Sequence, residues 1–154
     1  MRFLLRNPKV QYTLRWGAPK PARMPRRPLR IAVVDDDPSV RRALTRLLGA
    51  FGMQTDVFES GLEFLCAAPW NGLDCLIVDF HMPRLTALDV LLALPKIRAG
   101  LPALVVTAEG DPETCAKCLA AGASEVLIKP IDEKVLLAAI DRAVHTEDRR
   151  LAET

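Results

Sequence analysis

The sequence predicts an α/β fold: a doubly wound parallel sheet of five strands with five helices packed on its two faces. Short aliphatic runs alternate with longer segments whose apolar residues recur at helical spacing, from residue 29 to residue 145. Several runs are apolar throughout, as expected of strands that are covered on both faces. Four of the five runs also end in Asp, Thr or Lys, polar residues at the strand ends where parallel sheets bind ligands.

The first half of this region is expected to contain three strands and two helices. The expected strands are residues 29–34, 53–58 and 74–79. After the first strand, Asp37 caps a helix whose first turn contains Pro38, and Gly52 ends that helix. After the second strand, residues 60–63 have the spacing of a capping box, which predicts a short helix to about residue 67.

The second half is expected to contain two strands and three helices. The expected strands are residues 103–107 and 126–129. The first helix has an apolar face of Leu88, Leu91, Leu92 and Leu94. Pro95 is expected to end or kink this helix, and Asp111 with Pro112 begins the next, which Gly122 ends.

Asp132 caps the last expected helix. Its apolar face is expected to be Val135, Leu136, Ala139, Ile140 and Ala143. Residues 146–154 then form a charged tail that we expect to fray.

The charges are distributed unevenly along the chain. Residues 1–30 carry nine basic and no acidic residues, whereas the remainder carries 12 basic and 19 acidic residues. Residues 1–28 also contain five of the 12 prolines and no sustained periodicity, so we expect a disordered, basic, proline-rich arm. Its charge could attract nucleic acid or an acidic surface. Alternatively, the arm is an unstructured extension, or Met24 is the true start of the protein.

Nothing in the sequence indicates export or a membrane. No apolar run approaches the roughly 18–20 residues of a membrane span, and residues 3–5 are too short for a signal peptide. Four cysteines without a secretion signal indicate reduced thiols, so we expect a cytoplasmic protein. Cys115 and Cys118 lie one helical turn apart, and we interpret them as small buried thiols rather than a metal or redox pair.

The polar residues at the strand ends form a candidate site for phosphoryl transfer. They are Asp35 and Asp36 after the first strand, Asp79 at the end of the third, Thr107 on the fourth and Lys129 on the fifth. Three carboxylates at one edge would raise one another's pKa, and a Mg²⁺ ion would remove that conflict. Asp79 could then attack a phosphoryl donor, while Lys129 and the Thr107 hydroxyl stabilise the equatorial oxygens.

Four segments, in this order and spacing, resemble the response-regulator receiver domain of two-component signalling. They are VVDDD (33–37), LIVDFHMP (76–83), VVTAEGD (105–111) and AGASEVLIKP (121–130). The resemblance covers residues 29–145 and implies a flavodoxin-like sheet with the strand order 2-1-3-4-5. The first part is most similar to receivers of helix-turn-helix transcription regulators, but we expect no DNA-binding domain in this chain.

The resemblance implies a role for each residue around the acceptor. Asp79 would take a phosphoryl group from a sensor histidine kinase or a phosphotransfer protein. Asp36 would be a direct Mg²⁺ ligand and Asp35 a direct or water-mediated one. The backbone carbonyl of His81 would complete the protein ligands.

The two remaining residues would handle the phosphoryl group. Thr107 would be the switch hydroxyl, and Lys129 would bind the phosphoryl group next to a cis bond to Pro130. The protein would not be an enzyme in the usual sense, because it would catalyse only its own phosphorylation and dephosphorylation.

Phosphorylation would switch a surface that runs from the fourth strand and the helix after it to the last helix. This surface would contact an unknown downstream protein, and a homodimer formed on phosphorylation is a further candidate. A stand-alone regulator, a competitor for phosphoryl groups and a truncated transcription factor all fit this interpretation.

Two departures from the family pattern support a rival hypothesis. Val126 stands where the family usually has an aromatic residue, and Ala87 stands where it usually has Gly. A pseudo-receiver that binds partners without phosphorylation is therefore the alternative. An Asp-nucleophile phosphatase of the haloacid dehalogenase type is disfavoured, because it needs a second Asp where this chain has His81.

Overall fold

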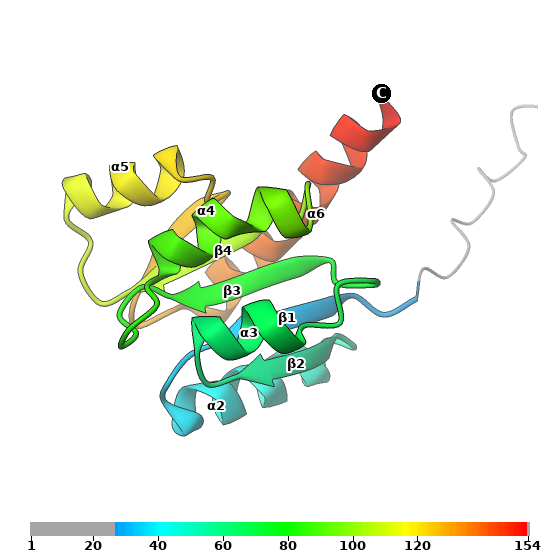
Figure 1. Cartoon of the computed structure of the whole chain (residues 1–154). Helices are drawn as coiled ribbons and strands as arrows, with labels where there is room; N and C mark the ends of the chain where they lie inside the picture. Colours follow the sequence, from blue (N-terminus) through cyan, green and yellow to red (C-terminus); the bar gives the residue numbers. More distant parts are fainter. Residues whose placement is uncertain (1–26, 154) are drawn as a thin grey trace, which may run out of the picture.

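The computed structural model describes residues 27–153, in which five parallel strands form a sheet between two layers of helices (Figure 1). Its elements are β1 (Arg30–Val34), α2 (Pro38–Ala50), β2 (Gln54–Phe58), α3 (Gly61–Ala67), β3 (Cys75–Asp79), α4 (Ala87–Ile97), β4 (Ala103–Thr107), α5 (Pro112–Ala120), β5 (Glu125–Ile128) and α6 (Glu133–Ala152). The basic arm expected at residues 1–28 lies outside the described residues except for its last two positions.

The strand order is β2-β1-β3-β4-β5, which confirms the predicted fold class and topology. Val34 pairs with Phe58 on one side and with Val78 on the other, so β1 and β3 end at nearly the same level. All neighbouring strands are parallel, so the five strands end at the same edge of the sheet, and the arrowheads of β2 and β3 in Figure 1 show its direction. This edge is where residues that follow the strands can meet.

Each face of the sheet has its own hydrophobic core, because successive strand residues point to opposite faces. One core lies under α3, α4 and α5 and includes Val34, Phe64, Leu76, Val78, Leu91, Leu94 and Cys118. The other lies under α2 and α6 and includes Ile31, Val33, Leu44, Leu48, Ile77, Leu136 and Ile140. All residues of β3 and β4 are buried, which explains why these strands are apolar up to their last residues, Asp79 and Thr107.

The predicted helix starts at Asp37, Asp111 and Asp132 are confirmed. Each carboxylate accepts a hydrogen bond from a backbone N–H in the first turn of its helix. The capping box expected at residues 60–63 forms only in part. The Ser60 hydroxyl accepts a hydrogen bond from the N–H of Glu63. The Glu63 carboxylate accepts from the N–H of Glu59, whereas a full capping box would have it accept from the N–H of Ser60.

Helix α4 differs from the prediction at both ends. Thr86 and Asp89 form a full capping box at its start, which was not predicted from the sequence. Pro95 does not end the helix, which continues to Ile97: the proline removes one i→i−4 hydrogen bond, but the N–H of Arg98 beyond it still donates to the carbonyl of Leu94. Leu92, expected on the apolar face, is 63% exposed.

The expectation of a frayed tail after His145 is wrong for the described residues, because α6 continues to Ala152. In Figure 1 the last turns of α6 extend beyond the end of the sheet. The Glu147 carboxylate lies so close to Gly100, in the loop before β4, that a side chain at Gly100 would collide with it. On the same helix Val135 is 49% exposed, whereas Val144 is buried.

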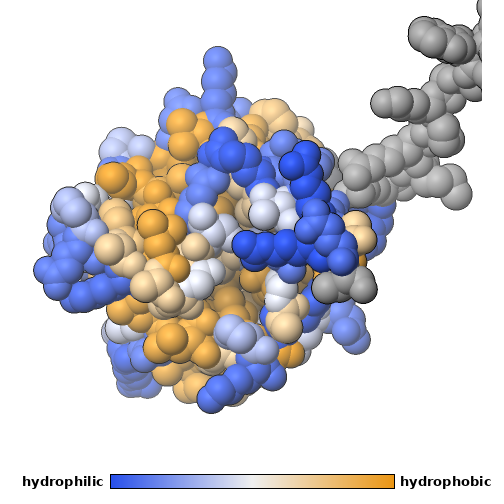
Figure 2. All heavy atoms as spheres, turned by 90° about the horizontal axis from the view of Figure 1, so that it is seen from above, coloured by the Kyte–Doolittle hydropathy of each residue, from blue (hydrophilic) through white to orange (hydrophobic). Residues whose placement is uncertain are grey.

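Figure 2 looks onto the side of the molecule on which α4 and α5 lie, and apolar side chains gather there between charged ones. Leu92 and Ile97 on α4 and Leu119 on α5 are exposed apolar residues of these helices. No helix within residues 27–153 has the length and apolar character that a membrane crossing requires.

Candidate functional site

Three carboxylates meet at the edge of the sheet where the strands end. Asp79 is the last residue of β3, and Asp35 and Asp36 follow β1, its neighbour in the sheet. One oxygen from each lies within 4.8 Å of the others, and we call these three residues the acidic cluster. Asp35 and Asp79 are buried, whereas Asp36 is exposed. Among residues 27–153, no other His, Cys, Asp or Glu side chains form such a group of three.

Lys129 follows β5 and reaches the acidic cluster from two strands away. Its ammonium nitrogen lies 2.9 Å from Oδ1 of Asp79 and 3.6 Å from Oδ2 of Asp35. Partial burial disfavours the ammonium ion, but the hydrogen bond to Asp79 and both carboxylate charges outweigh it, so the pKa of Lys129 is raised. The bond between Lys129 and Pro130 is cis.

The Asp35 carboxyl is in an unfavourable electrostatic environment. Burial raises the pKa of its carboxyl, the hydrogen bond from the Asp37 N–H opposes that shift, and the charge of Asp79 adds to it. A hard divalent cation would relieve this strain, since it neutralises charge that Lys129 balances only in part. The acidic cluster therefore fits Mg²⁺.

Thr107 is the fully buried last residue of β4, between the strands that carry Asp79 and Lys129. Its hydroxyl donates to the carbonyl of Glu109 and accepts from the N–H of Glu109, both at 3.1 Å. The structure therefore brings Thr107 to the expected edge of the sheet, with its hydroxyl bonded to the loop that follows β4.

His81 lies in the exposed loop after β3, with its ring edge-on to that of Phe80. Metal binding by its carbonyl stays a prediction. Val126, which stands where the family usually has an aromatic residue, is half-buried against the core under α3, α4 and α5. The Ile128 side chain lies against the loop before α5. It is so close to Gly110 that any side chain at position 110 would collide with that of Ile128.

One side chain at this site, Arg41, was not predicted from the sequence. Its guanidinium donates a 2.6 Å hydrogen bond to the backbone carbonyl of Asp35. A usable signal exists in the sequence, because Arg41 lies in the first turns of α2 and helical side chains lean toward the helix N-terminus. The acidic loop, residues 35–37, directly precedes the N-terminus of α2, so a side chain that leans this way reaches it.

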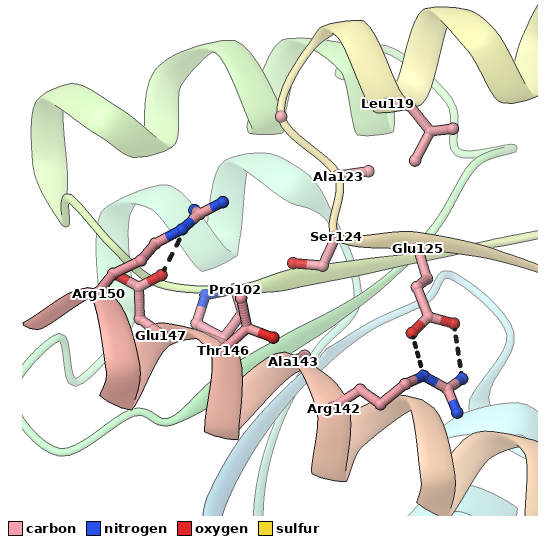
Figure 3. A pocket seen from close by; sticks show the side chains of 11 residues that line it. Pro102, Leu119, Ala123, Ser124, Glu125, Arg142, Ala143, Thr146, Glu147 and Arg150 are labelled. Carbon is pink, nitrogen blue, oxygen red and sulfur yellow. Dashed lines mark hydrogen bonds and ion pairs between the residues drawn. The ribbon is translucent and has the colours of Figure 1, made fainter.

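A cavity of about 450 Å³ lies at the opposite end of the sheet, where β5 begins (Figure 3). Arg142 donates two hydrogen bonds, of 2.7 and 2.9 Å, to Glu125 and holds the pKa of that carboxyl below its ordinary value. Arg150 lies 3.8 Å from Glu147. No predicted site residue lines this cavity, so it is separate from the strand-end site.

Comparison with known proteins assigns the chain to a family. A family model described as the response regulator receiver domain matches residues 31–141. The response regulator protein TodT of Pseudomonas putida is 33% identical over 114 residues, which are 74% of this chain and 50% of TodT. The transcriptional regulatory protein FixJ of Rhizobium meliloti is 30% identical over 113 residues, 73% of this chain and 55% of FixJ.

The chain thus spans about half the length of the curated relatives it matches. Among solved structures, a response regulator receiver domain protein from Clostridium thermocellum is 28% identical, with a TM-score of 0.73. The match covers 78% of this chain and 97% of that one. The family model covers most of the chain and the fold agrees with it, so this chain belongs to the family of response regulator receiver domains.

Proposed function

We propose that this protein is a phosphoaccepting receiver in which Asp79 takes a phosphoryl group from the phosphohistidine of a sensor histidine kinase or phosphotransfer protein. The observation that carries the proposal is the acidic cluster with Lys129 against Asp79 at 2.9 Å. A carboxylate beside two other acids and a lysine has the surroundings of a nucleophile toward phosphorus, rather than those of a structural ion pair.

In the transfer step, an oxygen of Asp79 forms a bond to phosphorus while the bond from phosphorus to the donor's imidazole nitrogen breaks. That nitrogen keeps the electron pair. Mg²⁺, held by the acidic cluster and the carbonyl of His81, would neutralise charge on the phosphoryl oxygens. Lys129 is close enough to move its ammonium group from the Asp79 carboxylate to a phosphoryl oxygen. Outside this reaction and its reversal by hydrolysis, we propose no catalytic activity.

Thr107 would couple phosphorylation of Asp79 to a change in the loop after β4. To donate to a phosphoryl oxygen, its hydroxyl has to give up the hydrogen bond that it donates to the carbonyl of Glu109, and this would loosen the loop before α5. The exposed Ile128 on β5 lies against Gly110 of that loop, and Val135 on α6 is an exposed apolar residue as well. We propose that this region contacts a downstream protein or a second copy of the chain, in the cytoplasm.

The pseudo-receiver remains the second candidate, and a specific observation favours it. Val126 is packed against the core in the place of the usual aromatic, so the inward rotation of an aromatic ring has no counterpart here. In that case the same surface would bind its partner whether or not Asp79 is phosphorylated.

Incubation of the full chain with Mg²⁺ and acetyl phosphate, followed by intact-mass measurement, tests the proposal. We expect one added phosphoryl group in the natural protein and none in Asp79→Asn. Asp37→Asn is the matched control, because Asp37 lies in the same loop outside the acidic cluster and Asn is an equally good helix cap. An unmodified but folded natural protein at every donor concentration would favour the pseudo-receiver.

A further inference from the structure

Arg41 on α2 makes a hydrogen bond to the loop of residues 35–37 before this helix. It is the fourth residue of the helix and is half-buried, and its guanidinium reaches back to the carbonyl oxygen of Asp35 at 2.6 Å. The neighbouring Arg42 is exposed and reaches only the hydroxyl of Ser39, at 3.4 Å. Two adjacent arginines on one helix therefore have different surroundings, and only Arg41 touches the acidic loop.

The contact completes the hydrogen bonding of Asp35. Its N–H donates to the carbonyl of Phe58 at 3.2 Å, and its Oδ1 accepts from the N–H of Asp37 at 2.8 Å. Its Oδ2 faces Lys129. The backbone carbonyl of Asp35 lies just after the end of β1, where the sheet no longer supplies a donor. Because Asp35 is buried, this carbonyl needs a hydrogen-bond donor, and Arg41 supplies it.

We propose that Arg41 is a positioning residue for the cation site: it holds the loop of residues 35–37 so that the carboxylates of Asp35 and Asp36 face Asp79. This inference rests on the proposed function, since it assumes that the acidic cluster binds Mg²⁺. Groups behind the direct ligands set the orientation of those ligands, and their loss typically weakens metal binding by about 10–100-fold.

The hydrogen bond of Arg41 should strengthen Mg²⁺ binding, whereas its positive charge should weaken it. A guanidinium this close to a cation site repels the cation, so removal of the charge alone would tighten Mg²⁺ binding. Loss of the hydrogen bond would let the acidic loop shift and would weaken Mg²⁺ binding. The sign of the change in the dissociation constant therefore separates the two effects.

The experiment measures the Mg²⁺ dissociation constant of the full chain by titration calorimetry, without a phosphoryl donor. We expect Arg41→Met to weaken binding by about tenfold or more. Arg41→Lys should fall between Arg41→Met and the natural protein, because one guanidinium nitrogen makes the contact and an ammonium group can replace it in part. Arg42→Met is the matched control and should bind Mg²⁺ like the natural protein.

A second measurement follows the rate of phosphorylation by acetyl phosphate as the Mg²⁺ concentration rises. The rate of Arg41→Met should be low at limiting Mg²⁺ and should approach that of the natural protein at saturating Mg²⁺. If Arg41→Met does not fold, Arg41→Lys decides, since it keeps both a charge and a donor.

The inference is overturned by a variant at position 41 that binds Mg²⁺ as tightly as the natural protein or more tightly, while the natural protein binds and is phosphorylated. That result leaves the proposed function intact. A natural protein that binds no Mg²⁺ and accepts no phosphoryl group instead overturns the proposed function, and the role of Arg41 with it.

Discussion

The ammonium group of Lys129 lies 2.9 Å from Oδ1 of Asp79, although β4 separates the two strands that carry them. The lysine spans the width of one strand along the edge of the sheet and lies 3.6 Å from Asp35 as well. One flexible cation thus balances two buried carboxylates. This arrangement makes Lys129 a structural counter-ion as well as a candidate ligand for the phosphoryl group.

We predict that Lys129→Met lowers the free energy of unfolding by about 1–2 kcal/mol without Mg²⁺, because it leaves buried carboxylates without a counter-ion. This is less than a fully buried pair would lose, since the lysine side chain is 31% exposed. Saturating Mg²⁺ should restore most of the loss. Thermal unfolding with and without Mg²⁺ measures both effects, with the exposed Lys96→Met as control. Equal losses in the two variants would contradict the counter-ion role.

Two glycines in helices should respond to alanine in opposite directions. A side chain at Gly61 would lie 2.8 Å from Cγ2 of the buried Val90, so we expect Gly61→Ala to destabilise by about 1–3 kcal/mol. At Gly49, near the end of α2, no atom lies within 4 Å of the new methyl group. Gly49→Ala should therefore stabilise by about 0.5 kcal/mol through its higher helix propensity. Urea unfolding measures both, and a loss at Gly49 would show that the end of α2 is packed more tightly.

The capping box of α4 predicts a dependence of stability on pH. Asp89 accepts hydrogen bonds from the N–H and the hydroxyl of Thr86, both at 2.8 Å, and these lower its pKa from the ordinary 3.8. Because the pKa is depressed in the folded state, ionised Asp89 contributes stability above about pH 3.8. That contribution is lost as the pH falls through the lower folded value.

The measurement is the difference in the free energy of unfolding between the natural protein and Asp89→Asn, at pH 7 and near pH 3. We expect the natural protein to be more stable at pH 7 and the difference to shrink toward zero in acid. In a Thr86→Ala background the difference at pH 7 should be smaller, because one of the two donors is gone. A difference that does not change with pH would refute the charged cap.

The four cysteines should react with iodoacetamide in an order set by burial. Cys66 is exposed, whereas Cys75 is buried and burial raises its pKa to about 12. Cys118 is buried as well, and burial raises the pKa of its thiol, while Cys115 beside it is half-buried. Peptide mass mapping at pH 8 should find Cys66 modified first, and Cys75 and Cys118 only after unfolding. Early modification of Cys118 would argue for the redox pair instead.

The strands were predictable to within one residue, because buried parallel strands are apolar on both faces and proline or polar residues bound them. The helix starts were predictable for a similar reason. The caps at Asp37, Asp111 and Asp132 are made by a side chain and a backbone group that are neighbours in the sequence.

Helix faces and ends were less predictable, since they depend on distant parts of the chain. Leu92 has the apolar character of a core residue, but the space under α4 is taken by Val90, Leu91 and Leu94. Charge in the last turns of α6 indicated fraying, yet Glu147 packs against the loop at Gly100. A local pattern contains no information about such a contact.

The sequence by itself determined which chemical groups gather at the site, because the end of each strand is marked locally and parallel strands end at one edge. Only the tertiary structure decided which of these groups touch. Lys129 pairs with Asp79, which lies 50 residues earlier in the chain, and reaches Asp35 as well. The reason is that strand and cap signals arise from near neighbours, whereas side-chain pairing depends on distances that exist only once the sheet and its helices have packed.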